Sequence, residues 1–535
     1  MPSPPATLVA RIRSTPLADV FPAFMLATGL LLRLDVAYFT FLNPDEALHY
    51  LLSVQPSAVL AYQASLTTVH PPLLILWLHY WGSLGHSEWF LRLPCVLAGT
   101  AFCWIGYRWL QLVADEDTAR IALALLSFLP PMVLLSAELR QYAFLLFFMS
   151  LSIYLFDRGL EESSALKVAG SALCLYLALL THYSAFMFAA AFGSYGFMRF
   201  FAKRVPHNLI AVWMMGQMGA LGLAVFLVRT HVSHLDARGV VQRLTAGWFH
   251  VSTFHPGEEG AFWFALKANL RLFHYLCWSG AAGALALLLF VEGIVLLLKP
   301  GQQLEDSNKP THRQLGILLL LPFLINLAAA FAGKYPYGGT RHNSFLAIFA
   351  VAGISVTLSR WKRSLPRTVT VAIAVALAIV NLFPSPSGAS IRPEFQTRRL
   401  MNEAMGFLGG LPPGSTILTD QQGALLLSYY FCPDKVVQID PAPQPLHKFS
   451  CGSNYVISPF PRWFVFDSQT LPAALREVRQ METSGSKEKL WFFQGGWLVD
   501  NEPDVRLELA HYGCPSPRNF GGNILVCELA VPRPD

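Results

Sequence analysis

Asn43-Pro44-Asp45-Glu46 follows directly on an apolar segment at residues 17–39, so two adjacent carboxylates lie just past the end of a predicted membrane-spanning helix. A charge at this depth avoids the hydrocarbon centre of a bilayer, yet it still lies where lipid headgroups lie. The pair is therefore suited to chemistry on a substrate that a lipid carries. The alternative is that Asp45 and Glu46 are two solvated residues at a helix end.

The composition assigns the chain to the polytopic membrane proteins. Of its 535 residues, 54% are hydrophobic and 13% are charged, and the mean hydropathy is +0.43. Apolar segments of about 17–25 residues are long enough to span a bilayer as helices. We expect about eleven of them, at residues 17–39, 92–113, 119–137, 141–157, 166–182, 185–201, 208–229, 281–298, 314–333, 342–359 and 366–383.

Basic residues orient these helices, because Lys and Arg favour the cytoplasmic side of short loops. Arg11 and Arg13 predict a cytoplasmic N-terminus, and no cleaved signal sequence is expected ahead of the first helix. With strict alternation, most other clusters of Lys and Arg also fall in cytoplasmic loops. The acidic loop at residues 115–117 is an exception, but acidic residues count little in this rule.

The residues after about Pro384 are predicted to form an extracytoplasmic domain, since an odd number of crossings places them outside. Turn residues and charge become more frequent from Pro384-Ser385-Pro386-Ser387-Gly388 onward. Short apolar runs at 416–419 and 523–526 are typical of buried strands, and helical periodicity is visible at 397–408 and 421–430. We therefore expect a membrane domain at 1–383 and a small α/β or α+β domain at 384–535.

Cysteine usage differs between the two predicted domains. Cys432, Cys451, Cys514 and Cys527 would face an oxidising compartment and could form two disulfides, for which three pairings exist. The alternative is that they are free buried thiols. The other four lie in apolar segments and are expected to be packing residues: Cys95, Cys103, Cys174 and Cys277.

Many polar residues share the outer membrane face on this topology, at helix ends or in outer loops at about 40–91 and 230–280. Residues 73–85 are too short and broken to span, so we expect an amphipathic helix lying in the outer interface. A carrier with alternating access should instead show ionisable groups near helix midpoints and an internal repeat. No repeat is visible in the sequence, and Arg33 with Asp35 is the nearest approach to such groups.

Several motifs, taken in order, resemble those of the GT-C superfamily of membrane glycosyltransferases. The branch is that of protein O-mannosyltransferases and lipid A aminoarabinose transferases, similar to glycosyltransferase family 39, and the resemblance covers most of residues 17–360. The motifs are Asn43-Pro44-Asp45-Glu46-Ala47, His70-Pro71-Pro72-Leu73, residues 85–94, Ser136-Ala137-Glu138-Leu139-Arg140-Gln141-Tyr142, Thr181-His182-Tyr183-Ser184 and Tyr335-Pro336-Tyr337 followed by Arg341.

The resemblance implies transfer of a sugar from a polyprenyl-phosphate donor to an extracytoplasmic acceptor, which could be protein, lipid or glycan. It implies that Asp45 is the general base and that Glu46 supports it or contacts the acceptor. A carboxylate within hydrogen-bond reach can take the proton of an acceptor hydroxyl, and a single displacement inverts the anomeric carbon. The architecture suits an inner (plasma) membrane with the active face and the C-terminal domain outside.

The leaving phosphate requires positive charge, for which Arg341 and Arg140 are the best candidates because guanidinium groups pair phosphate oxygens in a bidentate way. Alternatively, Arg140 pairs with Glu138 as a structural bridge, Arg341 is a plain interfacial anchor, and His70 is a packing or capping residue. The complete set of predicted substrate-binding residues is His70, Glu138, Arg140, His182, Lys334, Tyr335, Tyr337 and Arg341.

A metal site and two other functions are alternatives to this prediction. His231, His234 and Asp236, with His250 and His255 nearby, could gather around a divalent metal, but we predict no metal site and no required cofactor. A transporter or flippase of lipid-linked sugars and a non-catalytic assembly factor for envelope glycans are the alternative functions. No nucleic-acid partner is indicated, because cytoplasmic loops facing anionic lipid account for the net charge of +6.

Overall fold

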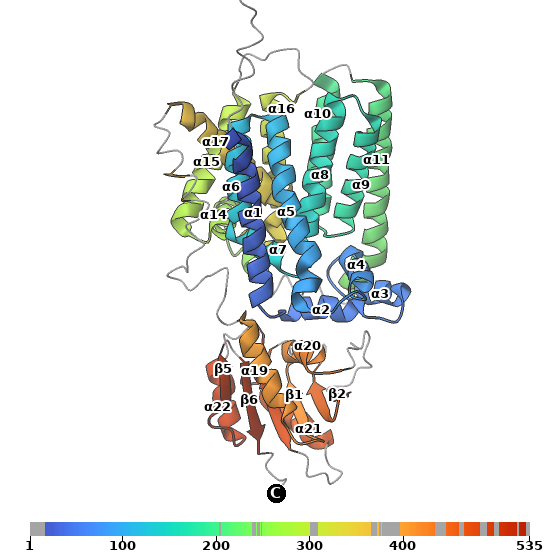
Figure 1. The fold of residues 1–535 in the computed structure, drawn as a ribbon, viewed down its shortest axis with the longest axis vertical. Coiled ribbons are helices and arrows are strands. Elements are labelled where there is room, and N and C mark those ends of the chain that lie inside the picture. Colours follow the sequence, from blue (N-terminus) through green and yellow to red (C-terminus); the bar gives the residue numbers. More distant parts are fainter. Residues whose placement is uncertain are drawn as a thin grey trace, which may run out of the picture.

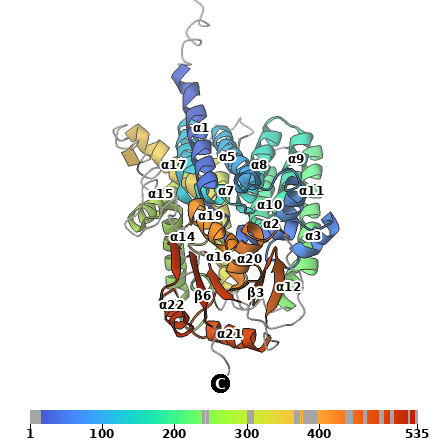
Figure 2. The ribbon, with the colours of Figure 1, turned by 60° about the horizontal axis from the view of Figure 1, so that its bottom comes forward.

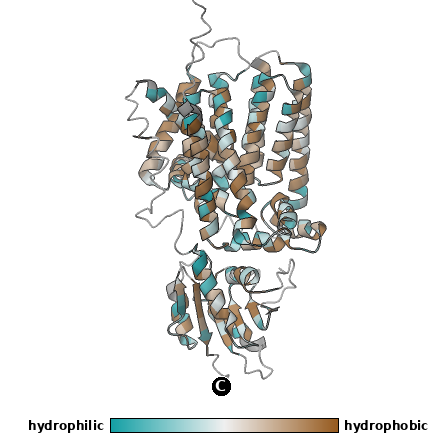
Figure 3. Ribbon diagram, in the orientation of Figure 1, coloured by the Kyte–Doolittle hydropathy of each residue, from teal (hydrophilic) through white to brown (hydrophobic). Residues whose placement is uncertain are grey.

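The computed structural model describes residues 16–530 except 203–204, 238–241, 243–246, 248, 300–308, 365–371, 374–375, 377–395, 434–445, 460–464, 482–488, 497–501 and 522–523. Long helices lie side by side in a bundle, and a domain built on a β-sheet lies at one end of it (Figure 1). Apolar residues cover much of these helices (Figure 3). Their bounds are α1 (Pro16–Phe39), α5 (Glu88–Val113), α6 (Glu116–Phe128), α7 (Pro130–Ala137), α8 (Tyr142–Glu161), α9 (Ala165–Leu179), α10 (Ala185–Ala202), α11 (His207–Leu227), α14 (Ala261–Cys277), α15 (Gly280–Leu298), α16 (His312–Phe331) and α17 (Ala347–Ser364).

Among the described residues, seven helices are long and apolar enough to cross a membrane, or eight if the bent pair α6 and α7 is one span. Helices α9 and α10 are apolar but shorter. The prediction of a polytopic membrane protein is therefore confirmed. The last expected span, at 366–383, lies almost wholly outside the described residues. The predicted outer loop at 230–280 contains the helix α14, which the sequence analysis missed because Lys267, Arg271 and His274 interrupt its apolar pattern.

The predicted span at 119–137 is broken, and α6 and α7 meet at 56°. Pro130 and Pro131 lack the N–H groups that would otherwise bond the carbonyls of Leu126 and Ser127. The buried Arg33 of α1 supplies the missing donors, since its Nη2 donates to Leu126 O at 3.1 Å and its Nη1 to Ser127 O at 3.0 Å. A charged residue inside the bundle thus stabilises a helix break, and residues 138–141 follow the bend at the end of the bundle that faces the sheet domain.

Three short helices lie at the end of the bundle that faces the sheet domain (Figure 1), namely α2 (Pro44–Ser53), α3 (Ala58–Ser65) and α4 (Leu73–Trp81). Of these three, only α4 was expected from the sequence, as the interfacial helix at residues 73–85. Helix α2 begins with a capping box, in which the Asn43 side chain accepts from the Glu46 N–H and the Glu46 carboxylate accepts from the Asn43 N–H. Pro44 at the first helical position has no N–H to leave unpaired. These residues fix where α2 begins.

The C-terminal region is an α/β unit built on one six-stranded sheet, in the order β2-β3-β1-β4-β6-β5. Strand β1 pairs in parallel with β3 and β4, while the outer strands are antiparallel. The elements are α19 (Arg398–Gly409), β1 (Thr416–Thr419), α20 (Gln421–Tyr430), β2 (His447–Cys451), β3 (Asn454–Ser458), α21 (Thr470–Met481), β4 (Leu490–Gln494), α22 (Glu502–His511), β5 (Arg518–Gly521) and β6 (Ile524–Leu529). The predicted small C-terminal α/β unit is confirmed, whereas the predicted boundary near 383 lies outside the described residues.

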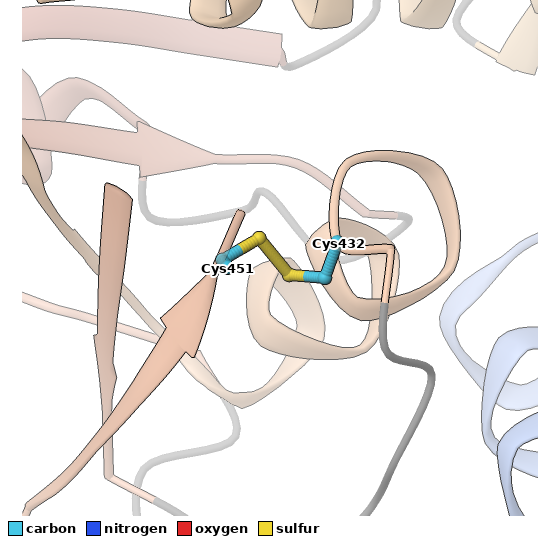
Figure 4. Close-up of a disulfide and its surroundings, with 2 residues drawn as sticks. All are labelled: Cys432 and Cys451. Atoms are coloured by element: carbon cyan, nitrogen blue, oxygen red, sulfur yellow. A yellow bond between two sulfur atoms is a disulfide. The ribbon is translucent and has the colours of Figure 1, made fainter. Parts of the chain in front are cut away.

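Two disulfides join the four cysteines of this region. Cys432, just after α20, pairs with Cys451 at the end of β2 (Figure 4), and Cys514 pairs with Cys527 of β6. The structure therefore selects one of the three pairings that the sequence left open. The other four cysteines are buried and unpaired, as expected of packing residues.

Helix α20 attaches this unit to the bundle, where its residues pack against α2 (Figure 2). Leu425 and Tyr429 join a buried apolar cluster with Leu42, Ala47 and Leu51. The Leu42 N–H donates to the Tyr430 hydroxyl at 2.7 Å, and that hydroxyl also bonds the Glu88 carboxylate. The sheet domain therefore contacts the segment that immediately precedes Asp45.

Candidate active site

Five segments that are far apart in the sequence converge at the end of the bundle that faces the sheet domain. They are the start of α2, the loop before α4, the loop between α7 and α8, the loop between α9 and α10, and the 3-10 helix η4 (Arg341–Leu346). Most of the predicted site residues lie on these segments. Ionisable side chains brought together at the end of a bundle are the usual composition of a catalytic or binding site.

Asp45 lies at the start of α2 between two arginines. Its Oδ2 accepts hydrogen bonds from Nη1 of Arg140 and, at 2.7 Å, from Nη2 of Arg341. Arg140 is buried, with 2% of its side chain exposed, whereas 23% of Asp45 and 30% of Arg341 are exposed. Burial disfavours the charged carboxylate, but the two guanidinium groups outweigh it and hold the pKa of Asp45 well below its usual range. The ion pair of Arg140 in the described residues is therefore with Asp45, and not with Glu138 as in the alternative prediction.

The loop that carries Arg341 is shaped by glycine. Gly338 has φ +142°, a conformation that other residues rarely adopt, and a Cβ on Gly339 would lie 2.6 Å from the Arg271 carbonyl. Asn343 closes the turn, because its Nδ2 donates to Gly338 O at 3.0 Å. Arg341 is thus held at a fixed helix start opposite Asp45.

Glu46 faces the protein interior and not the site. Its carboxylate is fully buried and pairs with Arg92, whose Nε and Nη2 each donate at 2.7 Å. Glu46 also accepts from the N–H groups of Leu139 at 2.6 Å and Asn43 at 2.8 Å. Arg92 in turn donates to carbonyls at the end of α1. This network ties α2 to the loop that carries Arg140.

Four histidines form a cluster beside the arginines, in which the rings of His70, His182 and His342 contact one another and the ring of His49 contacts that of His70. Their centroids lie 5.6–6.4 Å apart, and Tyr142 contacts His182 at 5.2 Å. Burial, assisted by Arg140, lowers the pKa of His49 and of His182 to about 3. Burial and the neighbouring His182 lower that of His70 as well. His49, His70 and His182 are therefore neutral at physiological pH.

Several buried polar atoms around this cluster have no hydrogen-bond partner in the described structure. A buried polar atom is normally paired, and an unpaired one marks a place for water or a ligand. The unpaired atoms include Nδ1 of His49, His70 and His342, Oε2 of Glu138, Nε of Arg140 and the Tyr142 hydroxyl. Of these groups, Glu138 has a raised pKa, because it is buried and lies near the Glu46 carboxylate.

Three predicted substrate-binding residues lie at the edge of this site. Lys334 is exposed, and in the described residues no ion pair involves it. The Tyr335 hydroxyl donates to His342 O at 3.2 Å, so it supports the start of η4. Tyr337 is buried, and its hydroxyl donates to Asn269 Oδ1 at 2.7 Å. No contact among the described residues joins Lys334 or Tyr337 to Asp45, and their predicted role in substrate binding stays a prediction.

The histidines considered for a metal separate into two sets. Both nitrogens of His231 are engaged, by the Tyr183 hydroxyl at 2.5 Å and by Thr68 O at 3.0 Å. Within the described residues, the ligand atoms of His250, His255 and Glu258 lie within 4.8 Å of one another, on a largely exposed loop. These three residues lie outside the cluster around Asp45.

Sequence reasoning left His49, Tyr142 and His342 out of the predicted set. Tyr142 ends one of the quoted motifs, His49 lies two residues after another, and His342 follows Arg341 directly. Their positions close to predicted site residues could have indicated them. His49, for example, is one helical turn after Asp45 and so lies on the same face of α2. Only the fold shows that Tyr142 contacts His342 and that His49 contacts His70.

The geometry defines a polytopic helical membrane protein with a charged site at the end of the bundle that faces the sheet domain. Residues 69–229 match the family model of dolichyl-phosphate-mannose-protein mannosyltransferases. No curated protein matches the chain by sequence. ArnT from Cupriavidus metallidurans bound to undecaprenyl phosphate is 13% identical, with 98% of this chain and 100% of that chain covered and a TM-score of 0.53. Apo ArnT from the same organism is also 13% identical, with 97% of this chain and 100% of that chain covered and a TM-score of 0.52. The predicted resemblance to the GT-C superfamily of glycosyltransferases is confirmed by the family match and the fold.

Proposed function

We propose that this protein transfers a sugar from a polyprenyl-phosphate donor to an extracytoplasmic acceptor, with inversion at the anomeric carbon. The observation that carries the proposal is the partly exposed Asp45 carboxylate held beside two guanidinium groups at the end of a membrane bundle. A base and an anion site adjoining a lipid surface are what this reaction requires. The match to a mannosyltransferase family model and the undecaprenyl phosphate bound to ArnT support a donor of this class.

In the proposed reaction, Asp45 takes the proton of the acceptor hydroxyl as its oxygen attacks the anomeric carbon. The new oxygen–carbon bond forms while the bond from that carbon to the phosphate oxygen breaks, and its electron pair remains on the phosphate. The reaction therefore produces polyprenyl phosphate, which carries more negative charge than the donor. General base catalysis of this kind contributes about 10²–10⁴-fold to rate.

Arg341 and Arg140 stabilise the developing charge on the phosphate. Arg341 is 30% exposed and can reach a ligand, while Arg140 lies behind it in the protein. Guanidinium groups match phosphate oxygens in geometry and in charge. Arg341 is therefore assigned as the first contact and Arg140 as the second. Lys334 is exposed and is assigned to the approach of the anionic headgroup at the site entrance.

The neutral imidazoles and Glu138 are assigned to the sugar. Sugar hydroxyls are recognised by groups that donate and accept hydrogen bonds, and a neutral imidazole does both. His70, His182 and Glu138 lie beside the arginines, and unpaired atoms of His70 and Glu138 are available for a ligand. Tyr335 and Tyr337 act indirectly, since they hold the loop that carries Arg341.

Glu46 is assigned as a positioning residue. It holds α2 against the Arg140 loop through Arg92 and the Leu139 N–H. No metal is part of the proposed reaction. We further propose an inner-membrane location with a cytoplasmic N-terminus and an extracytoplasmic active site, which the two disulfides of the C-terminal domain support.

The test is release of polyprenyl phosphate from a panel of polyprenyl-phosphate sugars by the purified protein, with total envelope extract as acceptor. Wild type should release it from at least one donor only when acceptor is present, and Asp45→Asn should lose about 10²-fold or more of that rate. Equal release by both proteins, or none with any donor, would contradict the proposal.

A further inference from the structure

Asp45 is in a state that does not suit a general base. One carboxylate oxygen, Oδ2, accepts hydrogen bonds from both Arg140 and Arg341. An efficient base has a pKa near the working pH, whereas these guanidinium groups hold the pKa of Asp45 far below it. Asp45 must therefore be separated from the two arginines before it can accept a proton.

The same two arginines form the only cationic pair that contacts Asp45 in the described residues, and they are the groups assigned to the donor phosphate. The Asp45 carboxylate and a phosphate oxygen are similar anionic acceptors, so each can occupy the same place between the guanidinium groups. Both cannot do so together, because two anions at one position repel each other.

We propose, on the basis of the function above, that in the donor-free protein Asp45 occupies the position of a donor phosphate oxygen. The phosphate displaces it, starting at the accessible Arg341, and this displacement releases Asp45 to act as the base. Two consequences follow: the donor binds before the acceptor is activated, and the free enzyme has no active base with which to deprotonate water or other hydroxyl groups.

The structure favours a displacement of Asp45 over a movement of the arginines. Arg140 is buried and contacts the Tyr142 ring, with its guanidinium 5.6 Å from the centroid. Arg341 begins η4, which Asn343 holds through bonds to Gly338 and Thr340. In the described structure the side chain of Asp45 makes hydrogen bonds to the two arginines and to no other group, so a rotation of this side chain alone would separate it from them.

The displacement of Asp45 has an unusual consequence for the affinity of the protein for phosphate. If Asp45 competes with phosphate, its removal should strengthen phosphate binding while it abolishes transfer. Asp45→Asn and Asp45→Ser in the full-length protein in detergent should each bind polyprenyl phosphate about tenfold or more tightly than wild type, because one charge-assisted competitor is lost. Arg341→Gln should weaken binding, and the uncharged polyprenol should bind all variants equally.

Asp117→Asn is the matched control, since Asp117 pairs with Lys362 at 2.6 Å away from this site and its removal should not change the dissociation constant. If wild type binds polyprenyl phosphate and both Asp45 variants bind it equally or more weakly, the displacement proposal is wrong and the proposed function stands. If wild type and every variant fail to distinguish polyprenyl phosphate from polyprenol, the proposed function is wrong as well.

Discussion

Asp45 and Glu46 are neighbours in the chain, but they have opposite surroundings. Asp45 is 23% exposed and faces two arginines of the site, whereas Glu46 is fully buried against Arg92. Helical geometry explains the difference, because successive residues of α2 point about 100° apart. One carboxylate is thus available for chemistry and the other for structure.

Glu46→Gln should therefore destabilise the protein more than Asp45→Asn does. The change leaves the Arg92 guanidinium buried without a carboxylate, and breaking such a pair costs about 3–5 kcal/mol. Thermal unfolding in detergent measures the difference. A Glu46→Gln protein that is as stable as Asp45→Asn but inactive would show that Glu46 takes part in the reaction directly.

The sequence predicted which residues the fold brings together better than it predicted their contacts. The motifs identified Asp45, Arg140, Arg341, His70 and His182, all of which the fold brings together. The sequence could not show which carboxylate of the pair is buried, because that depends on where the capping box fixes the start of α2. Nor could the sequence show that Arg140 forms its ion pair with Asp45 and not with Glu138, since this depends on distances in the folded protein.

Helix α6 ends where two prolines remove hydrogen-bond donors, and Arg33 replaces them. Arg33→Met should destabilise the bundle by about 1–3 kcal/mol for each carbonyl left unpaired in an apolar interior. Pro130→Ala with Pro131→Ala restores two backbone donors, so the cost of Arg33→Met should shrink in that background. Additive costs in this double-mutant cycle, measured by thermal unfolding, would contradict the assignment.

Asp420 connects β1 to α20 and should make the C-terminal domain less stable at high pH. It is fully buried and caps α20, with Oδ1 accepting from the Gly423 N–H at 2.8 Å, and burial raises its pKa to about 7. Since the pKa in the folded state exceeds the usual 3.8, the folded protein binds the proton more tightly. The stabilisation is complete below about pH 4 and is lost as the pH rises through 7.

Asp420→Asn keeps the capping oxygen and removes the charge, so its stability advantage over wild type should grow by about 3 kcal/mol between pH 5 and pH 8. The change Asp467→Asn at a half-buried carboxylate is the control, and its difference from wild type should not grow over this range. Melting temperatures across pH measure both variants. A constant difference for Asp420→Asn would contradict a raised pKa.

The whole molecule joins a membrane bundle to a sheet domain through the segment that bears the site. Tyr430 of α20 contacts Glu88 and Leu42, three residues before Asp45. Tyr430→Phe should lower stability by about 1–3 kcal/mol, because it leaves the Leu42 N–H unpaired, and should lower kcat through a shift of α2. Tyr455→Phe, on an exposed side chain, is the control. Unchanged kcat and stability in Tyr430→Phe would mean that the sheet domain does not position the site.

Much of this architecture could be predicted from the sequence. Long apolar segments and short strands such as β1 carry their own periodicity, so the membrane bundle and the α/β unit were expected. The short helices α2 and α3 and the bend before α7 were not, because their stability comes from caps and from Arg33 rather than from a long repeat. The attachment through α20 depends on contacts between residues hundreds of positions apart, for which a single sequence carries no signal.

The central claim is a single displacement in which Asp45 is the base. The most direct test is the anomeric configuration of the transferred sugar, determined by NMR with a donor that carries ¹³C at its anomeric carbon. The product should have the configuration opposite to that of the donor. Retention of configuration would contradict the account, because it requires a covalent sugar–enzyme intermediate or another route that a lone base does not provide.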